Sequence, residues 1–430
     1  MDLQALLKDM KNCPCGTTHT FDTKFCEIGS GLTAKTGVIL EKAEFDKRIL
    51  LVADRNTLKA ADGIADALKG SGFIVKQLIY DDQKYAMAEQ IDEIEGLCSD
   101  VGSLISVGTG SLNDICRVAA FRKEKQYCIF ATAPSMDGFA SDTAPIVKNN
   151  YKTSWKAKQP EVIIGDTEIL AASPTVLKSA GFGDMMAKYL ALVEWKIARL
   201  VGGEYYCENV AGLVEEAIRR ITALCGDVTG SSELTAGKVM EALVLTGLAM
   251  KLTGNSRPAA GSEHVVSHFW ECKKIVKGIW PDFHGRKVGV ATVLLNRMYR
   301  QIAADYPEIE THSDNPDWDT IKEAYGPALV DSMLAENNPS IVANIDPAHL
   351  KACWPEIRTL ILTELPTDEH LVGMMKRAGA ATTPEEVHVD AQLLHDGLKY
   401  HPYMRRRLLL SRLLPMTNID IDQYIAGLRA

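Results

Sequence analysis

Two segments in the second half of the chain combine histidine and carboxylate side chains at spacings that suit a metal ion. His264 and His268 are four residues apart in a helical pattern, so they share one face of the expected helix. His284 follows in an Asp-Phe-His-Gly sequence, and Asp184 follows a glycine-rich turn in an otherwise apolar helical segment. Imidazole and carboxylate donors together favour a borderline divalent ion such as Zn²⁺ or Ni²⁺ over Ca²⁺ or Mg²⁺.

A ligand set of one aspartate and two histidines leaves coordination positions open. An open position is what a Lewis acid needs in order to polarise a carbonyl oxygen. The alternative is that each histidine is a structural residue held by hydrogen bonds, with no metal involved. The residue types and spacing leave both interpretations standing.

A glycine-containing turn near residue 108 suits the phosphates of a dinucleotide. An apolar strand pattern ends at Gly108, and a helical pattern follows Gly110. The two glycines let the backbone approach a pyrophosphate, and the free N–H groups at the start of the helix face the anion. Asn113 stands where a complete G-x-G-x-x-G fingerprint has its third glycine. A tight strand-to-helix turn without a ligand is the alternative.

Two further strand ends carry polar groups suited to a nucleotide or a polyol. The next strand ends in Thr-Ala-Pro-Ser-Met-Asp-Gly at 132–138, and ordinary turn chemistry is the alternative interpretation. Asp54 closes an earlier strand, where its carboxylate could accept a hydrogen bond from a ribose hydroxyl and would repel a 2′-phosphate. Asp54 therefore favours NAD(H) over NADP(H), although helix capping explains it nearly as well.

The elements that must position these residues change in character near residue 172. Before it, strands are expected at 48–54, 73–80, 103–110, 127–134 and 161–166, and helices at 57–72, 87–98 and 112–121. Alternating strands and helices indicate a Rossmann-like parallel sheet, with ligands at the carboxyl ends of its strands. From Pro174 onward only helical periodicity appears. We expect an α/β domain at 1–172 and an all-α domain at 173–430.

Composition narrows the class of protein. A chain of 430 residues suits two domains, and 46% hydrophobic with 24% charged residues is ordinary for globular proteins. The net charge of −9 and the lack of a long basic run argue against nucleic-acid binding. We expect no signal peptide, no membrane span and a cytoplasmic location. Ten cysteines at irregular spacing are expected to be reduced thiols.

The motifs, in this order, resemble the family of sn-glycerol-1-phosphate dehydrogenases. That family lies within the superfamily of iron-containing alcohol dehydrogenases, glycerol dehydrogenase and dehydroquinate synthase. The resemblance covers roughly 25–300 and is carried by the segments 108–110, 132–138, 181–184, 256–264 and 283–285. It implies reversible reduction of dihydroxyacetone phosphate to glycerol 1-phosphate with NAD(H), or with NADP(H), and a divalent Zn, Ni or Fe ion. It also implies a homo-oligomer, often a dimer.

Residue roles follow from this resemblance. Asp184, His264 and His284 are expected to bind the metal, and Asp184 also to contact the substrate. Asp137 and His268 are expected to contact the substrate without binding the metal, and His268 to relay a proton. The expected cofactor site comprises Asp54, Gly108, Gly110, Ser111, Leu112, Asn113, Asp114, Thr132, Ala133, Pro134, Ser135 and Ser141. The candidate cations for the substrate phosphate are Lys156, Lys158, Arg257, Arg286 and Lys287.

Some features depart from the resemblance or leave rivals open. Thr109 stands where many relatives have a glycine, and its side chain could narrow the turn that is expected to bind the pyrophosphate. An N-terminal group of Cys13, Cys15 and His19, with Cys26 beyond, could be a structural zinc site, although a turn with core thiols is the interpretation we favour. Glycerol dehydrogenase and a dehydroquinate synthase-like lyase remain the rival activities.

Overall fold

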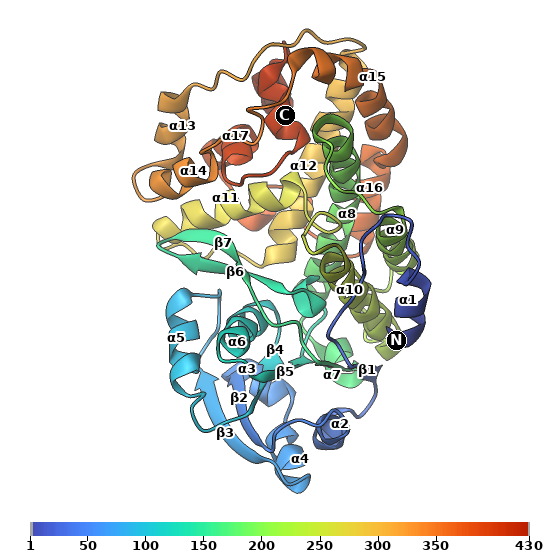
Figure 1. Ribbon diagram of the computed structural model, residues 1–430, viewed down its shortest axis with the longest axis vertical. Helices are drawn as coiled ribbons and strands as arrows, with labels where there is room; N and C mark the ends of the chain where they lie inside the picture. The colour runs from blue at the N-terminus through green and yellow to red at the C-terminus, as the bar shows by residue number, and fades with distance from the viewer. Residues whose placement is uncertain (1–2, 429–430) are drawn as a thin grey trace. The chain divides into compact units, whose positions relative to one another are not determined.

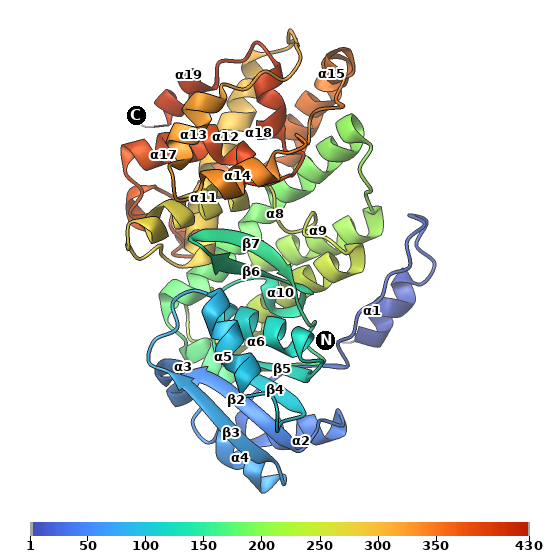
Figure 2. The ribbon, with the colours of Figure 1, turned by 60° about the vertical axis from the view of Figure 1, so that its left-hand side comes forward.

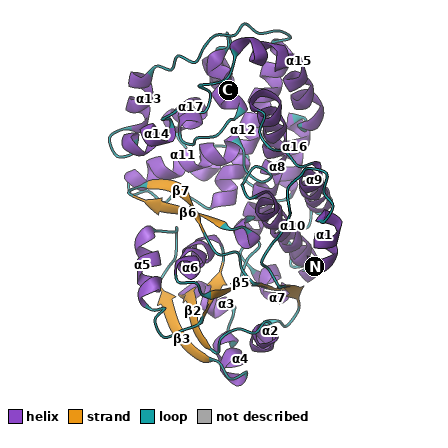
Figure 3. Ribbon diagram, in the orientation of Figure 1, coloured by secondary structure: helices purple, strands orange, loops and turns teal. Residues whose placement is uncertain are grey.

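The structure is a computed structural model and describes residues 3–428. Its first part is a six-stranded sheet in which every pair of neighbouring strands is parallel (Figure 1; Figure 3). The strand order is β1 (Phe25–Gly29), β8 (Val162–Asp166), β5 (Gln126–Ala131), β4 (Ser103–Gly108), β2 (Arg48–Asp54) and β3 (Ile74–Tyr80). The predicted Rossmann-like sheet is therefore confirmed.

Helices cover both faces of this sheet. Alternate residues of β2, such as Ile49 and Leu51, join one buried cluster with α2 (Thr36–Lys42) and α4 (Ile64–Gly70). The intervening Leu50 is equally buried, and α6 (Gly110–Arg122) contacts β4 and β5 while α5 (Ala88–Gly96) packs on α6. Burial on both faces explains why these strands read as continuous apolar runs.

The single helix expected at 57–72 is two helices. The structure has α3 (Arg55–Ala60) and α4, separated at Gly63, whose φ is +85°. A left-handed backbone at this glycine ends one helix and begins another, because a right-handed helix cannot continue through it. The amphipathic pattern persists across the break, which is why periodicity alone did not reveal it.

Three strands were absent from the sequence-based prediction. They are the edge strand β1 and the hairpin of β6 (Thr143–Lys148) with β7 (Tyr151–Lys156), a separate two-stranded sheet (Figure 2). The hairpin turns at Asn149 and Asn150, with φ of +52° and +63°. Positive φ at both central residues suits the right-handed twist of a two-residue hairpin, and asparagine tolerates it.

After β8 the described residues form helices and turns, with no further strand beyond an isolated bridge. The helices near the candidate site are α8 (Thr175–Gly202), α11 (Ser262–Val276) and α12 (His284–Asp305). The remaining helices are α7 (Thr167–Ala172), α9 (Glu208–Thr222), α10 (Glu233–Thr253), α13 (Trp318–Tyr325), α14 (Val330–Glu336), α15 (Pro347–Glu364), α16 (Asp368–Arg377), α17 (Ala391–Tyr400), α18 (Leu410–Leu413) and α19 (Ile421–Gly427). The helical C-terminal region matches the prediction.

The chain divides into two compact units along a line that differs from the expected boundary at 172/173. One unit contains the chain up to Lys148, Lys152–Met185 and Asn209–Ser256, and the other contains Asn149–Tyr151, Met186–Glu208 and the chain from Arg257 onward. Helix α10 belongs with the sheet because it packs on α7, β1 and the 3-10 turn η2 (Gly138–Ala140). The division falls inside α8 and inside the first turn of α9.

The second unit has its own apolar core. Trp270 of α11, Tyr299 of α12 and Trp354 of α15 lie in one buried cluster, together with the C-terminal part of α8. This packing fixes the face that α11 and α12 turn toward each other. Along the described residues, no helix is both long enough and apolar enough to cross a membrane.

Candidate functional site

Three histidines come together from two adjacent helices. His264 and His268 stand one turn apart on α11, with ring centroids 6.5 Å apart, and His284 is the first residue of α12. The His284 ring lies 5.2 Å from that of His264 and 5.8 Å from that of His268. The close packing of α11 on α12 therefore brings together histidines that are 20 residues apart in the sequence.

Asp184 lies on α8 and is held by the loop that follows β5. The backbone N–H of Asp137, in that loop, donates to Asp184 Oδ2 at 3.0 Å. Helix α8 approaches the loop closely because residue 181 is glycine: a Cβ there would lie 2.0 Å from the carbonyl oxygen of Pro134. The glycine-rich turn noted in the sequence is thus the closely packed face of a continuous helix.

The donor set of Asp184, His264 and His284 fits a divalent metal ion. Each residue offers one ligand atom, a carboxylate oxygen or an imidazole nitrogen, and these atoms all lie within 4.8 Å of one another. Asp184 is fully buried and His264 is only 7% exposed, so two of the donors are shielded from water. One carboxylate and two neutral imidazoles suit a borderline divalent ion and leave coordination positions for a substrate.

Glu263, to which the sequence analysis gave no role, orients His264. Its Oε1 lies 2.8 Å from His264 Nδ1 and also accepts from the backbone N–H of Gly261 at 2.6 Å. A carboxylate beside Nδ1 favours the tautomer with its proton there, and Nε2 then carries the lone pair that can bind a metal. The only available signal in the sequence was a glutamate next to a candidate histidine at a helix start.

A second buried glutamate anchors the beginning of α11. Glu194 of α8 accepts from Ser262 N and Ser262 Oγ, both at 2.6 Å, and from Tyr299 Oη at 3.1 Å. Burial, with Glu263 nearby, raises the pKa of the Glu194 carboxyl. Because Ser262 stands two residues before His264, this network fixes the position of the first turn of α11 relative to α8.

Each of the two expected substrate contacts lies beside at least one of the expected metal donors. Asp137 is 7% exposed and touches Asp184 through its own backbone amide. His268 is half-buried on the same face of α11 as His264. Gly247 of α10 adds to the packing, since a Cβ there would lie 2.8 Å from the carbonyl oxygen of Asp137.

The glycine turn lies between β4 and α6, as the strand and helix patterns predicted. Gly108 ends β4 and Gly110 begins α6, so the first N–H groups of this 13-residue helix lie at the turn. The backbone N–H of Thr132 donates to the Gly108 carbonyl at 3.1 Å, which places the 132–135 loop alongside. A Cβ at Gly110 would contact Met136 at 3.4 Å. The first backbone N–H groups of α6 therefore lie at the turn, a geometry that suits an anion.

Several side chains expected at the cofactor are occupied by an internal network. Arg117, which the sequence analysis did not single out, is 1% exposed and donates to Asp114 Oδ1, to Ser141 Oγ at 2.7 Å and to the Gly138 carbonyl at 2.7 Å. Asn113 Oδ1 accepts from Tyr127 Oη at 2.7 Å. Asn113, Asp114 and Ser141 therefore hold the loops in place, whichever cofactor groups they also meet.

Asp54 is a helix cap in the structure. Its Oδ1 accepts from Thr57 N at 2.8 Å as the N-cap of α3, and its Oδ2 faces Gln83 N at 3.4 Å. Capping was the alternative that the sequence left open. Among the other expected cofactor residues, Leu112, Ala133 and Ser135 are buried at the two turns, and Ser111 Oγ donates to the Lys84 carbonyl.

The candidate phosphate-binding cations differ in what already holds them. Lys287 is buried against Glu271 at 2.9 Å, and Arg257 donates to both carboxylate oxygens of Glu204, so each of these cations already has a carboxylate partner within the chain. Both were candidates in the sequence, where a buried ion pair cannot be recognised. Lys158 pairs with Glu161, Arg286 pairs with Asp282, and Lys156 Nζ lies 5.2 Å from the centre of the Phe121 ring.

Comparison with known proteins places the chain among dehydrogenases. The family of iron-containing alcohol dehydrogenases matches residues 27–174. A glycerol-1-phosphate dehydrogenase (NAD(P)+) of Bacillus subtilis is 36% identical over 295 residues, which cover 66% of this chain and 74% of that protein. One of Geobacillus stearothermophilus is 29% identical over 405 residues, covering 92% and 93%, and one of Methanosarcina barkeri is 32% identical over 341 residues, covering 78% and 89%.

Solved structures share the fold. A glycerol dehydrogenase of Schizosaccharomyces pombe superposes with a TM-score of 0.63 at 15% identity, covering 96% of this chain and 90% of that one. At such low identity the likeness concerns the fold alone. The sequence relatives carry the assignment: the chain belongs to the glycerol-1-phosphate dehydrogenase family and is an oxidoreductase of the iron-containing alcohol dehydrogenase type.

Proposed function

We propose that the chain catalyses the reversible, NAD(P)H-dependent reduction of dihydroxyacetone phosphate to glycerol 1-phosphate. The proposal rests on one observation above the others: the donor atoms of Asp184, His264 and His284 lie within 4.8 Å of one another. Relatives that are up to 36% identical bear the name of this activity. A catalytically silent relative would have no reason to keep three buried or half-buried donors together.

The three donors would hold a divalent ion, with zinc or nickel preferred and iron as a third candidate. When bound, such an ion supplies Lewis acidity that polarises the ketone carbonyl. The chain contributes the geometry. Glu263 keeps the proton of His264 on Nδ1, and the Asp137 amide holds one oxygen of the Asp184 carboxylate in position.

Two neighbouring residues would act on the substrate directly. The Asp137 carboxylate, in the loop that supports Asp184, would accept a hydrogen bond from a substrate hydroxyl and so orient the ketone. The His268 imidazole would relay a proton from water to the C2 oxygen during reduction and accept it during oxidation. An imidazole suits both directions because its ordinary pKa lies near neutral pH.

The turn at 108–110 and the first turn of α6 would bind the cofactor pyrophosphate through backbone N–H groups. The reduced nicotinamide supplies the hydride. Asp54 favours NADH, because a carboxylate at this strand end would repel the 2′-phosphate of NADPH. Its capping bonds do not remove its negative charge, so the preference remains although the carboxylate also stabilises α3.

The test is an NADH and NADPH oxidation assay with metal analysis on the same protein. Dihydroxyacetone phosphate, dihydroxyacetone and glyceraldehyde phosphate are offered in turn, before and after removal of metal by a chelator. We expect turnover with dihydroxyacetone phosphate, its loss on chelation and its return with Zn²⁺ or Ni²⁺. Preference for dihydroxyacetone would support a glycerol dehydrogenase instead, and full activity in metal-free protein would exclude the proposed mechanism.

A further inference from the structure

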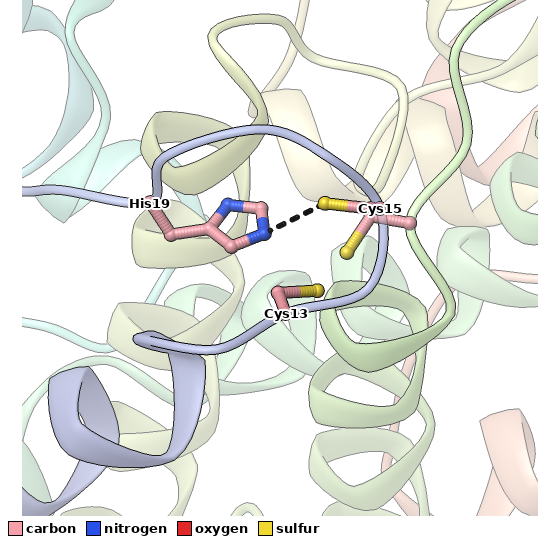
Figure 4. A group of neighbouring side chains, drawn as sticks. Cys13, Cys15 and His19 are labelled. Carbon is pink, nitrogen blue, oxygen red and sulfur yellow. Dashed lines mark hydrogen bonds between the residues drawn. The ribbon is translucent and has the colours of Figure 1, made fainter.

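A second group of potential metal ligands lies near the N-terminus, apart from the catalytic donors. Cys13, Cys15 and His19 belong to the loop between α1 (Leu3–Met10) and β1, and their side chains turn toward one another (Figure 4). Cys15 Sγ lies 3.2 Å from His19 Nε2. None of these residues has a role in the proposed reaction, so their proximity calls for a separate explanation.

The orientation of His19 suits a ligand. Its Nδ1 lies 2.7 Å from the carbonyl oxygen of Leu252 in α10, so Nδ1 carries the proton and donates to that carbonyl. In that tautomer of the neutral ring Nε2 carries the lone pair, and it faces the Cys15 sulfur. Histidine ligands in metal sites are commonly fixed in this way, with the second ring nitrogen donating to a backbone carbonyl or carboxylate.

Both cysteine sulfurs receive N–H donors. The backbone N–H of Thr17 points at Cys15 Sγ at 3.4 Å, and Asn209 Nδ2, in the first turn of α9, points at Cys13 Sγ at 3.3 Å. Outer hydrogen bonds of this kind commonly hold metal-binding side chains in position. The reversal of the loop depends on Gly16, whose φ is +80°.

A fourth donor completes the set. Cys207 immediately precedes α9, two residues before Asn209, and the ligand atoms of Cys13, Cys15, His19 and Cys207 all lie within 4.8 Å of one another. All four cysteine and histidine side chains are buried or half-buried, and none of the cysteines forms a disulfide. Tetrahedral zinc with bonds of about 2.3 Å to sulfur places sulfur ligands roughly 3.8 Å apart, which matches such a spacing.

We propose that Cys13, Cys15, His19 and Cys207 bind one structural Zn²⁺ ion. Three thiolates and one imidazole fill all four positions of a tetrahedral zinc site, so no position is open for a substrate and the ion would be structural. Its effect would be to fasten the N-terminal segment to the start of α9 and, through His19, to α10. This proposal does not depend on the proposed function.

Cys26, grouped with these residues on sequence alone, is not part of the site. It lies on β1 and is buried in the sheet, where loss of solvation raises the pKa of its thiol to about 12. Its sulfur also lies outside the group of ligand atoms that are within 4.8 Å of one another. The fourth ligand, Cys207, is 192 residues further along the chain than Cys15, as their numbering shows.

Cobalt substitution distinguishes this site from the catalytic one. The catalytic donors contain no sulfur, so in Co²⁺-loaded full-length protein only the N-terminal site can give thiolate-to-cobalt charge-transfer absorption in the near ultraviolet. We expect that band in the wild type and in His264→Ala, and its loss in Cys15→Ser. Wild-type protein that binds cobalt without the band would overturn the proposal.

Elemental analysis of zinc-loaded protein gives a second measurement. We expect two zinc ions per chain in the wild type, and one in both Cys15→Ser and His264→Ala. Cys98→Ser is the matched control: Cys98 Sγ donates to the Ile94 carbonyl at 3.2 Å, a bond that serine can make, and this variant should keep both ions. If Cys15→Ser does not fold, zinc release from wild type during thiol titration with a mercurial reagent decides the question. Release of no zinc would overturn the proposal.

Discussion

The backbone amide of Asp137 donates to the carboxylate of Asp184, joining the loop after β5 to helix α8 at 3.0 Å. A residue expected to touch the substrate thus supports a residue expected to bind the metal. This bond uses only the backbone of Asp137, so the side chain of Asp137 can be changed without removing the support of Asp184. The contact of the Asp137 side chain with the substrate and the support that its backbone gives Asp184 can therefore be measured separately.

Asp184→Asn should abolish metal binding and turnover while leaving the fold intact. The amide keeps the size of the carboxylate and can still accept the Asp137 N–H, but it loses the negative charge. Removing Lewis-acid assistance worth several kcal/mol corresponds to at least about a 10³-fold loss of kcat. Metal content per chain and steady-state NADH oxidation measure the effect. An active, metal-loaded variant would remove Asp184 from the ligand set.

Glu263→Ala should weaken the catalytic metal site without abolishing it. His264 loses the carboxylate that holds its tautomer, and loss of such a partner typically lowers metal affinity by about 10- to 100-fold. Competition with a chelator of known affinity measures the change, and excess metal should restore much of the turnover. Glu89→Ala removes a glutamate from the first turn of α5 and serves as the control. Equal metal affinities in the two variants would mean that Glu263 does not affect metal binding by His264.

Gly181→Ala and Gly212→Ala should have opposite effects on stability. A Cβ at Gly181 would lie 2.0 Å from the Pro134 carbonyl, whereas a Cβ at Gly212 in α9 meets nothing within 4 Å. We expect Gly181→Ala to cost about 1–3 kcal/mol of unfolding free energy and to reduce activity by displacing α8. Gly212→Ala should add about 0.4–1 kcal/mol. Urea unfolding monitored by circular dichroism measures the unfolding free energy of both variants. Similar changes in the two would contradict the close approach of α8 to the Pro134 carbonyl.

Stability should fall as the pH drops from about 6.5 to 4 because of His401. This histidine is fully buried beside Ser411 Oγ, and burial lowers its pKa from 6.5 to about 4. Above the unfolded-state pKa both states are neutral and the group has no effect on stability. Below it the unfolded chain takes up a proton that the folded chain refuses, so the folded state loses stability until the folded pKa is reached.

The measurement is the melting temperature at pH 7 and pH 5 for the wild type and for His401→Gln. Glutamine cannot titrate, so this variant should show a smaller decrease between the two pH values, even if it is less stable at pH 7. An identical decrease in both proteins would show that His401 does not contribute to the acid sensitivity.

The sequence was sufficient for the elements with strong periodicity. The buried strands β2, β4, β5 and β8 lie close to their expected positions, and α8 begins next to Pro174, where the helical pattern was expected to start. Continuous apolar runs and helical spacing are local signals. Strand β1 was missed because five residues containing Glu27 do not form an apolar run. Its place is fixed instead by pairing with β8, a contact made at long range.

In the candidate site, too, the sequence identified residues that have a local signal and missed contacts between distant segments. The spacing of His264 and His268 predicted a shared face, and the resemblance to a family selected Asp184 and His284. Contacts made only in three dimensions escaped prediction, including the support that Glu263 gives His264 and the association of Cys207 with Cys15. Ion pairs such as Lys287 with Glu271 likewise leave no signal in composition, which is why Lys287 was a candidate for the phosphate.

Helix α8 carries Asp184 and, ten residues later, Glu194, with hydrogen bonds tying the first to the loop after β5 and the second to Ser262. A helix turns by about 100° per residue, so inserting or deleting a single residue between them would swing the Asp184 carboxylate away from the histidines. Asp184, Glu194 and the histidines could all be retained and the enzyme would still be inactivated. The number of residues between Asp184 and Glu194 should therefore be more strictly constrained than the identity of those residues.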